Sequence, residues 1–383
     1  MKHILFVCNE LPPAPHGGIG IFVRILAEGL VSKGLKVSVV GYDETVAENT
    51  VAVEDGISVH RLYDPYTRSK KILLFGRYYI DAGFYFKRKY LSRYLKSVVK
   101  SADVDIVESY DWSGPLWSHP GVPLIVRMHG AYVASQLQEG KRASKVVAYC
   151  EKRNVKMADK LIAVSNHIGN TTNKALKLDN PFSVIHNFVD TTVFRPVEEV
   201  SRDVNKVVYV GRIHERKGLF ELFEAMTSIM KSNGRIHLDL YGRGEQQTIE
   251  ALKESVPPEA RLRIHFKGYV NHGELARVYS GAGIVVCPSR AEAFGLSAVE
   301  AMACGTPVLM TRETSGPEII KEGLNGELSY LKGDDLKATL SAMVNKAENN
   351  GYDPAKIREH VKETYSMDVV LEQNLSFYQD LKQ

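Results

Sequence analysis

The stretch from residue 283 to residue 310 constrains the fold more than any other part of the sequence. An apolar run, GIVVC at 283–287, predicts a buried strand, and a proline and a serine end it. A helical pattern follows up to Ala303, and a second apolar run at 308–310 predicts another strand. Strands that are joined through a helix lie parallel in a sheet. The stretch therefore predicts an α/β fold built on a parallel sheet.

The loop between this strand and this helix has the features of an anion site with two carboxylates beside it. Residues 294–296, Phe-Gly-Leu, lead into the helix, where free backbone N–H groups and the helix dipole attract an anion. Glu292 and Glu300 flank this point. They would repel a phosphate, but they can accept hydrogen bonds from sugar hydroxyls beside it. The alternative is one surface glutamate and one helix-face glutamate that lie eight residues apart by chance.

Length and composition restrict the class of protein. A chain of 383 residues is too long for one ordinary core, so we expect two domains. With 44% apolar and 25% charged residues the chain is typical of soluble globular proteins, and no run approaches the ~20 apolar residues of a membrane-spanning helix. The N-terminal residues are interpreted as a strand rather than a signal peptide. A net charge of +4 is too mild to indicate nucleic acid binding.

Cysteine usage bears on the compartment and on metal binding. Cys8, Cys150, Cys287 and Cys304 are widely scattered, and none of them has the spacing of a metal site. We therefore expect reduced thiols, a cytoplasmic location and no metal.

The first half of the chain begins as a strand–helix–strand unit with a glycine turn. Residues 4–8 predict a fully buried strand, and Gly17, Gly18 and Gly20 precede a helix pattern that runs to residue 32. The spacing GGxG is not the dinucleotide pattern GxGxxG, which disfavours a dehydrogenase. Backbone without side chains at Gly17 and Gly18 can approach a phosphate closely. The alternative is a flexible turn.

His129 directly follows another predicted strand, at 123–128. Active groups of open α/β sheets lie at the carboxyl ends of strands, so this histidine is well placed for function. A single histidine is more often structural, and its position alone leaves both interpretations open.

The segment 77–100 combines positive charge with aromatic residues. It holds seven lysines or arginines and one aspartate, a net charge of +6 (seven minus one), with seven tyrosines or phenylalanines interleaved. A helix of this kind can lie on an anionic bilayer surface. The alternative is a solvated helix whose aromatic side chains pack on its own domain.

A second alternating series of strands and helices starts at Lys206, after a charged stretch at 197–205 that we expect to be the linker. Arg212 and Lys217 stand on either side of one strand-to-helix loop of this series. Each alone is more often a solvated surface cation. Together with a helix N-terminus they can neutralise a departing diphosphate without a metal. The pattern favours transfer of a group from a nucleoside diphosphate.

These segments together resemble the family-4 retaining glycosyltransferases with the GT-B fold. The similar segments are the GR…KG pattern at 211–218, the GxG turn at 242–244, the E-x7-E segment within 288–308, and residues 316–320 and 325–326 in the second half, with 17–18, 158–165 and 187–190 in the first. Residues 47–103 carry no motif of the family.

The resemblance implies an α/β architecture of two Rossmann-like domains facing each other across a cleft. It implies an N-terminal acceptor-binding domain at 1–190 and a C-terminal nucleotide-sugar-binding domain at 191–366. A C-terminal helix at 367–383 is expected to pack back on the first domain.

The resemblance also implies roles for the matched residues. The implied catalytic residues are Glu292, His129, Arg212 and Lys217. The implied donor-binding residues are Gly17, Gly18, Arg212, Lys217, Gly268, Val270, Glu292, Phe294, Gly295, Leu296 and Glu300. In these roles the two cations bind the diphosphate, Glu300 the ribose hydroxyls and Glu292 a hydroxyl of the transferred sugar.

The implied reaction moves a sugar from a nucleotide sugar, with a UDP-sugar expected, to an acceptor hydroxyl with retention and without a metal or other cofactor. The resemblance assigns Glu292 to hydroxyl binding, so a front-face route is expected in which the leaving phosphate helps to deprotonate the acceptor. The expected pathway is cell-surface polysaccharide or glycolipid synthesis, and the acceptor is unidentified. The segment 77–100 suggests a lipid-linked acceptor at the inner face of the membrane.

Other functions on the same fold stay open at this point. A nucleotide-sugar epimerase would release its product without an acceptor, and a phosphorylase would need a cofactor lysine that no residue provides. A non-catalytic partner subunit is also compatible with the fold, although the intact glutamate and cation pairs argue against it.

Overall fold

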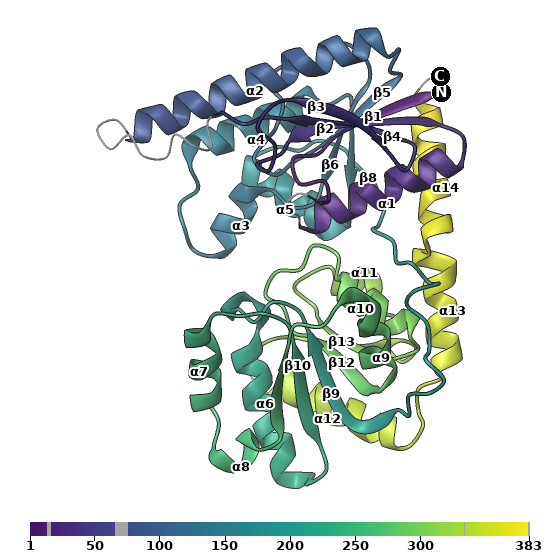
Figure 1. Ribbon diagram of the computed structural model, residues 1–383. Helices are drawn as coiled ribbons and strands as arrows, with labels where there is room; N and C mark the ends of the chain where they lie inside the picture. The colour runs from purple at the N-terminus through teal and green to yellow at the C-terminus, as the bar shows by residue number, and fades with distance from the viewer. Residues whose placement is uncertain (14–16, 66–75, 333, 382–383) are drawn as a thin grey trace. The chain divides into compact units, whose positions relative to one another are not determined.

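The computed structural model describes residues 1–13, 17–65, 76–332 and 334–381, and of residues 76–82 it describes only the backbone. The chain divides into two compact units (Figure 1). The first unit is Met1–Ile185 together with Leu371–Gln383, and the second is His186–Val370. The roles expected for the two domains, acceptor binding and nucleotide-sugar binding, stay predictions.

The first unit is built on an eight-stranded sheet with the strand order β3-β4-β2-β1-β5-β6-β7-β8. All neighbouring strands pair in parallel except β3 and β4. The strand order reverses direction between β1 and β5. The elements are β1 (His3–Val7), α1 (Gly18–Ser32), β2 (Lys36–Tyr42), β3 (Thr50–Glu54), β4 (Ile57–Leu62), α2 (Gly76–Ser101), β5 (Ile106–Tyr110), β6 (Leu124–Met128), α3 (Tyr132–Gln138), α4 (Lys145–Met157), β7 (Lys160–Ala163), α5 (Asn166–Leu176) and β8 (Ser183–Val184).

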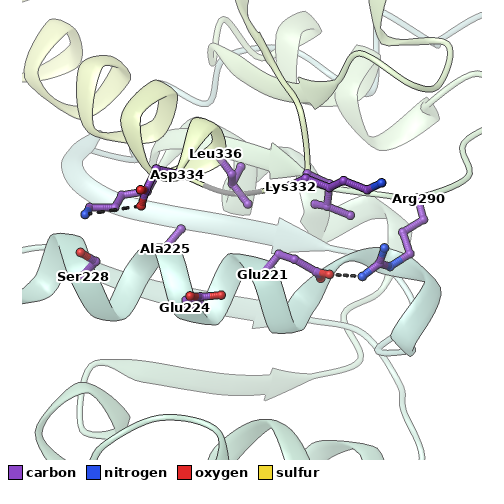
Figure 2. A pocket seen from close by; sticks show the side chains of 10 residues that line it. Glu221, Glu224, Ala225, Ser228, Arg290, Lys332, Asp334 and Leu336 are labelled. Carbon is purple, nitrogen blue, oxygen red and sulfur yellow. Dashed lines mark hydrogen bonds and ion pairs between the residues drawn. The ribbon is translucent and has the colours of Figure 1, made fainter.

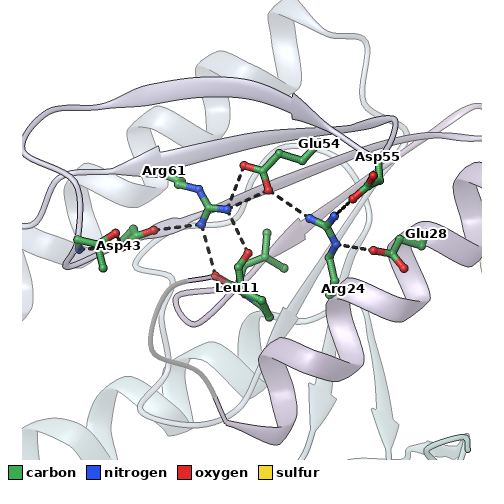
Figure 3. A network of polar contacts seen from close by, with 9 residues as sticks. Leu11, Arg24, Glu28, Asp43, Glu54, Asp55 and Arg61 are labelled. Carbon is green, nitrogen blue, oxygen red and sulfur yellow. Dashed lines mark hydrogen bonds and ion pairs between the residues drawn. The ribbon is translucent and has the colours of Figure 1, made fainter. Parts of the chain in front are cut away.

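A network of ion pairs fixes the chain that leads from β1 into the glycine turn (Figure 3). Arg61 of β4 donates hydrogen bonds to Asp43 and Glu54 and to the carbonyl oxygens of Leu11 and Pro12, the last at 3.1 Å. Arg24 of α1 pairs with the same Glu54 at 3.2 Å. Because one carboxylate joins both guanidinium groups, the hairpin β3–β4, helix α1 and the loop after β1 are held as one assembly. Residues 14–16, the remainder of that loop before Gly17, lie outside the described residues.

The second unit is built on a fully parallel six-stranded sheet with the order β11-β10-β9-β12-β13-β14. Helix α6 packs against α12, and α10 packs against α9 and α13. The elements are β9 (Asp203–Val210), a 3-10 turn (Glu215–Lys217), α6 (Leu219–Ser232), β10 (His237–Tyr241), α7 (Gln246–Glu254), α8 (Pro258–Arg261), β11 (Ile264–Gly268), a 3-10 turn (His272–Glu274), α9 (Leu275–Ser280), β12 (Ala282–Cys287), α10 (Leu296–Ala303), β13 (Val308–Thr311), α11 (Gly316–Ile319), β14 (Gly326–Ser329), α12 (Asp335–Glu348) and α13 (Pro354–Tyr365). Helix α14 (Met367–Asp380) begins in the second unit and belongs to the first unit from Leu371 onward.

The stretch 197–205, which we expected to be the linker, belongs to the second unit instead. Val197 donates its N–H to the hydroxyl of Ser280 at 3.1 Å, and Arg202 donates to the carbonyl oxygen of Gly305 at 2.8 Å. Strand β9 already begins at Asp203. Arg202, one of the charges that suggested a solvated linker, attaches this segment to its own unit.

The C-terminal residues of the first unit cover a buried ion pair. Arg127 of β6 donates to Glu108 of β5 with its Nε at 2.7 Å and its Nη2 at 3.2 Å, and both side chains are buried. Tyr378 of α14 donates its hydroxyl to Glu108 at 2.6 Å, and Asn374 accepts a hydrogen bond from Arg127. Each buried charge therefore has both an ionic partner and further hydrogen bonds, as burial requires.

Replacing Glu108 by glutamine should lower the free energy of unfolding by about 3–5 kcal/mol, because it leaves Arg127 buried without its counter-charge. The matched control is Glu372→Gln, which removes the carboxylate of an exposed ion pair with Lys33 on the same unit and should cost less than about 1 kcal/mol. Urea unfolding followed by circular dichroism compares the two variants. Equal midpoints for both would contradict the importance given to the buried pair.

Candidate active site

The start of helix α10 is formed by a glycine that the fold requires. Gly295 has a φ of +88°, a conformation that side chains disfavour, and a Cβ there would lie 2.8 Å from the Cε of Met310. The helix begins at Leu296, and its first N–H groups have no partner within the helix. The preceding Phe294 is buried, with its ring centroid 5.6 Å from that of Tyr365. The structure therefore places the predicted backbone amides at a helix start, and their binding of an anion stays a prediction.

Lys217 and Glu292 come together although they are far apart in the sequence. Lys217 ends the 3-10 turn after β9, and its Nζ lies 2.8 Å from a carboxylate oxygen of Glu292, which follows β12. The hydroxyl of Ser289 donates to the same oxygen at 3.3 Å. Arg212 lies at the carboxyl end of β9 with its side chain exposed. The structure thus brings one of the two predicted cations into contact with one of the two predicted carboxylates.

Glu300 is held in place by two residues that the sequence did not single out. Tyr279 of α9 donates its hydroxyl to one carboxylate oxygen at 2.9 Å, and the Nε2 of His272 lies 3.5 Å from the other. The hydrogen bond to Glu300 raises the pKa of His272 above its usual value. Burial raises the pKa of Tyr279 well above its usual value, so the phenol keeps its proton. Tyr279 lies among the buried residues of α9, and a tyrosine in such a position is ordinarily a core residue.

Two of the predicted donor-binding residues, Gly268 and Val270, lie at the end of β11 and just beyond it. Gly268 is exposed with a φ of +75°, and its carbonyl oxygen accepts the N–H of Gly242 at 2.8 Å. Val270 is half-buried. The exposed ring of Tyr269 lies between them, with the guanidinium of Arg243 at 4.4 Å from its centroid. This stacked pair is a further candidate for contact with a planar ligand. Arg243 lies in the GxG turn at 242–244 and Tyr269 lies between Gly268 and Val270, so both stand in segments that the resemblance marked.

Gly17 and Gly18, the two predicted glycines of the first unit, have different surroundings. The N–H of Gly17 donates to a carboxylate oxygen of Glu10 at 3.0 Å. Gly18 is the first residue of α1, and a Cβ built on it would meet no atom within 4 Å. The fold itself therefore does not require a glycine at position 18. Its bare backbone is left available for close approach by a ligand.

His129 follows β6 on a loop that a buried carboxylate fixes. Asp111 accepts the N–H of His129 at 3.0 Å and that of Gly130 at 3.1 Å. Burial, with the nearby charge of Arg127, lowers the pKa of His129 to about 3. Burial raises the pKa of Asp111 to about 7. The His129 imidazole is therefore neutral near pH 7 and can donate or accept a hydrogen bond rather than act as a cation.

A separate pocket of about 670 Å³ lies between α6 and α12 of the second unit (Figure 2). Its walls carry charges of both signs, and Figure 2 shows Glu221 of α6 paired with Arg290. None of the predicted donor-binding residues lines it. Its size alone gives it no role.

Two further features bear on the predicted partners. Among the described residues, no three His, Cys, Asp or Glu side chains are grouped as a metal ion would need. Independence from metals stays a prediction. None of the helices in the described ranges is long and apolar enough to cross a membrane.

Comparison with known proteins adds evidence of family. The model of "Glycosyltransferase Family 4" matches residues 16–193, and that of "Glycosyl transferases group 1" matches residues 190–364. An uncharacterized glycosyltransferase of Methanocaldococcus jannaschii is 27% identical over 400 aligned positions, covering 98% of this chain and 97% of its own.

Solved structures share the fold over the whole chain. Sucrose-phosphate synthase from Thermosynechococcus elongatus matches with a TM-score of 0.77 at 21% identity, covering 100% of this chain and 99% of its own. The Anabaena protein HepE in complex with UDP-glucose matches with a TM-score of 0.68 at 16% identity, covering 99% of this chain and 100% of its own. With two successive family models that leave few residues unmatched, the chain belongs to the family-4 glycosyltransferases and is a glycosyltransferase with the GT-B fold.

Proposed function

We propose that the chain is a retaining hexosyltransferase that moves a sugar from a nucleoside diphosphate sugar, UDP-sugar above all, to an acceptor hydroxyl in cell-surface polysaccharide or glycolipid synthesis. One observation carries the proposal: Lys217 and Glu292 pair at 2.8 Å beside Gly295, which begins helix α10, and Tyr279 orients Glu300 one helical turn further on. The second unit thereby combines positive charge, free backbone donors and two hydroxyl-binding carboxylates.

The departing diphosphate is the group that this arrangement stabilises. Negative charge grows on its oxygens as the bond from the sugar carbon C1 to the phosphate oxygen breaks. Lys217, Arg212 and the first N–H groups of α10 supply positive charge and hydrogen-bond donors for it. The complex of HepE with UDP-glucose supports UDP as the nucleotide.

The two carboxylates serve the hydroxyl groups of the donor. Glu300 keeps a fixed orientation because Tyr279 donates to it, and it accepts from the ribose hydroxyls. Glu292 is held by Lys217 and Ser289 and accepts from a hydroxyl of the transferred sugar. Gly18 offers its backbone to the diphosphate.

Retention follows from transfer on one face of the sugar. The acceptor oxygen forms its bond to C1 on the face that the diphosphate leaves, and the acceptor proton passes to a diphosphate oxygen. Glu292 is already engaged by Lys217, so it acts as a hydroxyl acceptor rather than as a nucleophile. His129, neutral at pH 7, hydrogen-bonds to the donor sugar near C1.

Nucleotide binding gives the direct test. The protein is mixed in turn with UDP-, GDP- and ADP-sugars. Only the sugars of one nucleotide should raise its melting temperature, and we expect that nucleotide to be UDP. A ligand at a hundred times its Kd adds about 2.7 kcal/mol, equivalent to about 5–11 °C for a unit of this size. Differential scanning fluorimetry measures the shift. No shift with any nucleotide would favour a partner subunit, and conversion of a UDP-sugar to its epimer without an acceptor would favour an epimerase.

Lys217→Ala should lower kcat by about 10²–10³, because the developing phosphate charge loses a positioned cation. Transfer of labelled sugar measures the rate. The matched control is Lys346→Ala, which removes an ion pair of nearly equal exposure: 30% and 23% for Lys346 and Glu327, against 30% and 21% for Lys217 and Glu292. Full activity of Lys217→Ala, with a normal melting temperature, would disprove the role of this lysine.

Helix α2 supports membrane contact with fewer residues than the sequence suggested. Arg88 is buried, and the half-buried Lys87 is engaged by Asp64, so we leave both out of the proposed membrane surface. The side chains of 77–82 lie outside the described residues. Phe86, Tyr90, Arg93, Lys96 and Lys100 are exposed. These five side chains bring the cytoplasmic enzyme to the anionic inner face of the membrane, where a lipid-linked acceptor would lie.

The triple variant Arg93→Glu, Lys96→Glu, Lys100→Glu should no longer sediment with phosphatidylglycerol vesicles. Each cation near such a surface contributes about 1 kcal/mol, and reversal of its sign turns attraction into repulsion. Wild-type binding should also fall with added salt.

The control for this variant reverses three charges on the second unit, at Lys231, Arg261 and Lys337, which are all exposed. Both triple variants have the same net charge. Equal sedimentation of the two would leave α2 as a solvated helix.

A further inference from the structure

A pocket of about 380 Å³ lies at the carboxyl edge of the first unit's sheet, between the ends of β1, β2 and β5. Asn9 and Glu10 line it from beyond β1, Tyr42 from the end of β2, and Trp112 from beyond β5. The strand order reverses between β1 and β5, and such a reversal opens the crevice where α/β sheets bind ligands. The volume is within the range of small-molecule sites.

Aromatic rings form much of the pocket wall. Tyr42, Phe84, Tyr110 and Trp112 all line it. Trp112 is 41% exposed, so a ligand can reach it. It meets the ring of Tyr132 edge to face at 5.7 Å, which fixes its orientation. Aromatic faces carry partial negative charge and attract the weakly positive C–H faces of a sugar ring.

Buried charged groups clamp the loop that presents Trp112. Arg88 donates to the carbonyl oxygens of Ser113 and Gly114, the latter at 2.7 Å. Glu151 of α4 accepts the N–H of Ser113 at 2.7 Å. Ser113 itself has a φ of +60°, which is uncommon for a residue with a side chain. Two buried charges and a strained residue therefore hold an exposed tryptophan in one place, as a binding platform needs.

The polar groups of the pocket have opposite charges. Lys87 lies 4.5 Å from the centroid of the Tyr42 ring and pairs with Asp64. Glu10 also lines the pocket, and it accepts the N–H of Gly17 at 3.0 Å. The second cation of the lining, Arg88, donates to backbone carbonyl oxygens of Phe84, Ser113 and Gly114. Lys87 and Glu10 suit hydroxyl groups, which both donate and accept hydrogen bonds. They do not suit an acyl chain, and the carboxylate disfavours a polyanion.

We propose that this pocket binds the acceptor, that the acceptor is a carbohydrate ring, and that Trp112 is its stacking platform. The proposal rests on the function proposed above. The Glu10 carboxylate in the pocket wall also accepts the N–H of Gly17, one of the predicted donor-binding residues. The acceptor sugar lies on Trp112, with its hydroxyl groups between Lys87 and Glu10.

The first experiment uses fluorescence and needs no donor. The chain has two tryptophans, so Trp117→Phe leaves Trp112 as the single reporter. This variant is titrated with maltose, lactose, methyl mannoside, methyl glucoside and N-acetylglucosamine. At least one sugar should change the emission of Trp112 in a saturable way. If none of them does, the pocket is not a carbohydrate site.

The second experiment measures transfer to the sugar so identified. Trp112→Ala should raise the KM for the acceptor by about tenfold, the usual range for loss of aromatic stacking, and leave kcat nearly unchanged. Trp112→Phe should recover most of the affinity. The matched control is Tyr149→Ala, which removes another exposed aromatic side chain of the first unit, outside the pocket, and should leave KM as in the wild type.

The outcomes separate the two proposals. Stabilisation by the nucleotide should be equal in wild type and Trp112→Ala, so a failure of the donor site shows in both proteins and concerns the proposed function. An unchanged acceptor KM in Trp112→Ala overturns the acceptor proposal alone. Transfer to diacylglycerol vesicles that Trp112→Ala does not weaken also overturns it, because the acceptor would then be a lipid hydroxyl.

Discussion

Parallel pairing of strands is the constraint on which the rest of this structure depends. In a parallel sheet all strands end at the same edge, so residues that follow different strands meet although the chain separates them widely. Lys217 after β9 and Glu292 after β12 reach hydrogen-bond distance in this way. In the first unit the same geometry gathers Glu10, Trp112 and His129 at one edge of the sheet. Chemistry is possible at these edges because the loops there are free to carry polar groups, while the strands themselves are buried.

Buried polar groups hold the functional groups at both sheet edges in place. Asp111, Glu151 and Arg88 are buried ionisable groups whose hydrogen bonds go largely to backbone of the loops after β5 and β6. Burial of such groups is unfavourable unless their hydrogen bonds are satisfied. Each group therefore favours the one loop conformation in which its hydrogen bonds form. In the second unit Tyr279 has a similar effect on a side chain, since its buried hydroxyl orients Glu300. Preorganisation of this kind lowers the reorganisation needed when charge develops in a reaction.

The sequence predicted the fold better than the details of the sites. Apolar strands and periodic helices gave the order of elements, and local motifs marked Gly295, Glu292 and Glu300, because these features depend on neighbours in the sequence. The prediction of a linker at 197–205 was wrong. Charged residues suggest a solvated segment, whereas Arg202 donates hydrogen bonds to backbone carbonyl groups of its own unit. Tyr279 and Trp112 were not predicted as site residues. Their roles come from partners distant in the chain, and an aromatic residue in isolation indicates a core.

The cover that α14 places over Arg127 and Glu108 has a consequence for biosynthesis. Strands β5 and β6 are translated early, but Asn374 and Tyr378 leave the ribosome only after the whole second unit has been made. Domains generally fold as they emerge, the N-terminal one first. Here the first unit must wait with a buried ion pair incompletely covered until residues 374–378 arrive. The hydrogen bonds that complete this ion pair can therefore form only after the second unit has been synthesised.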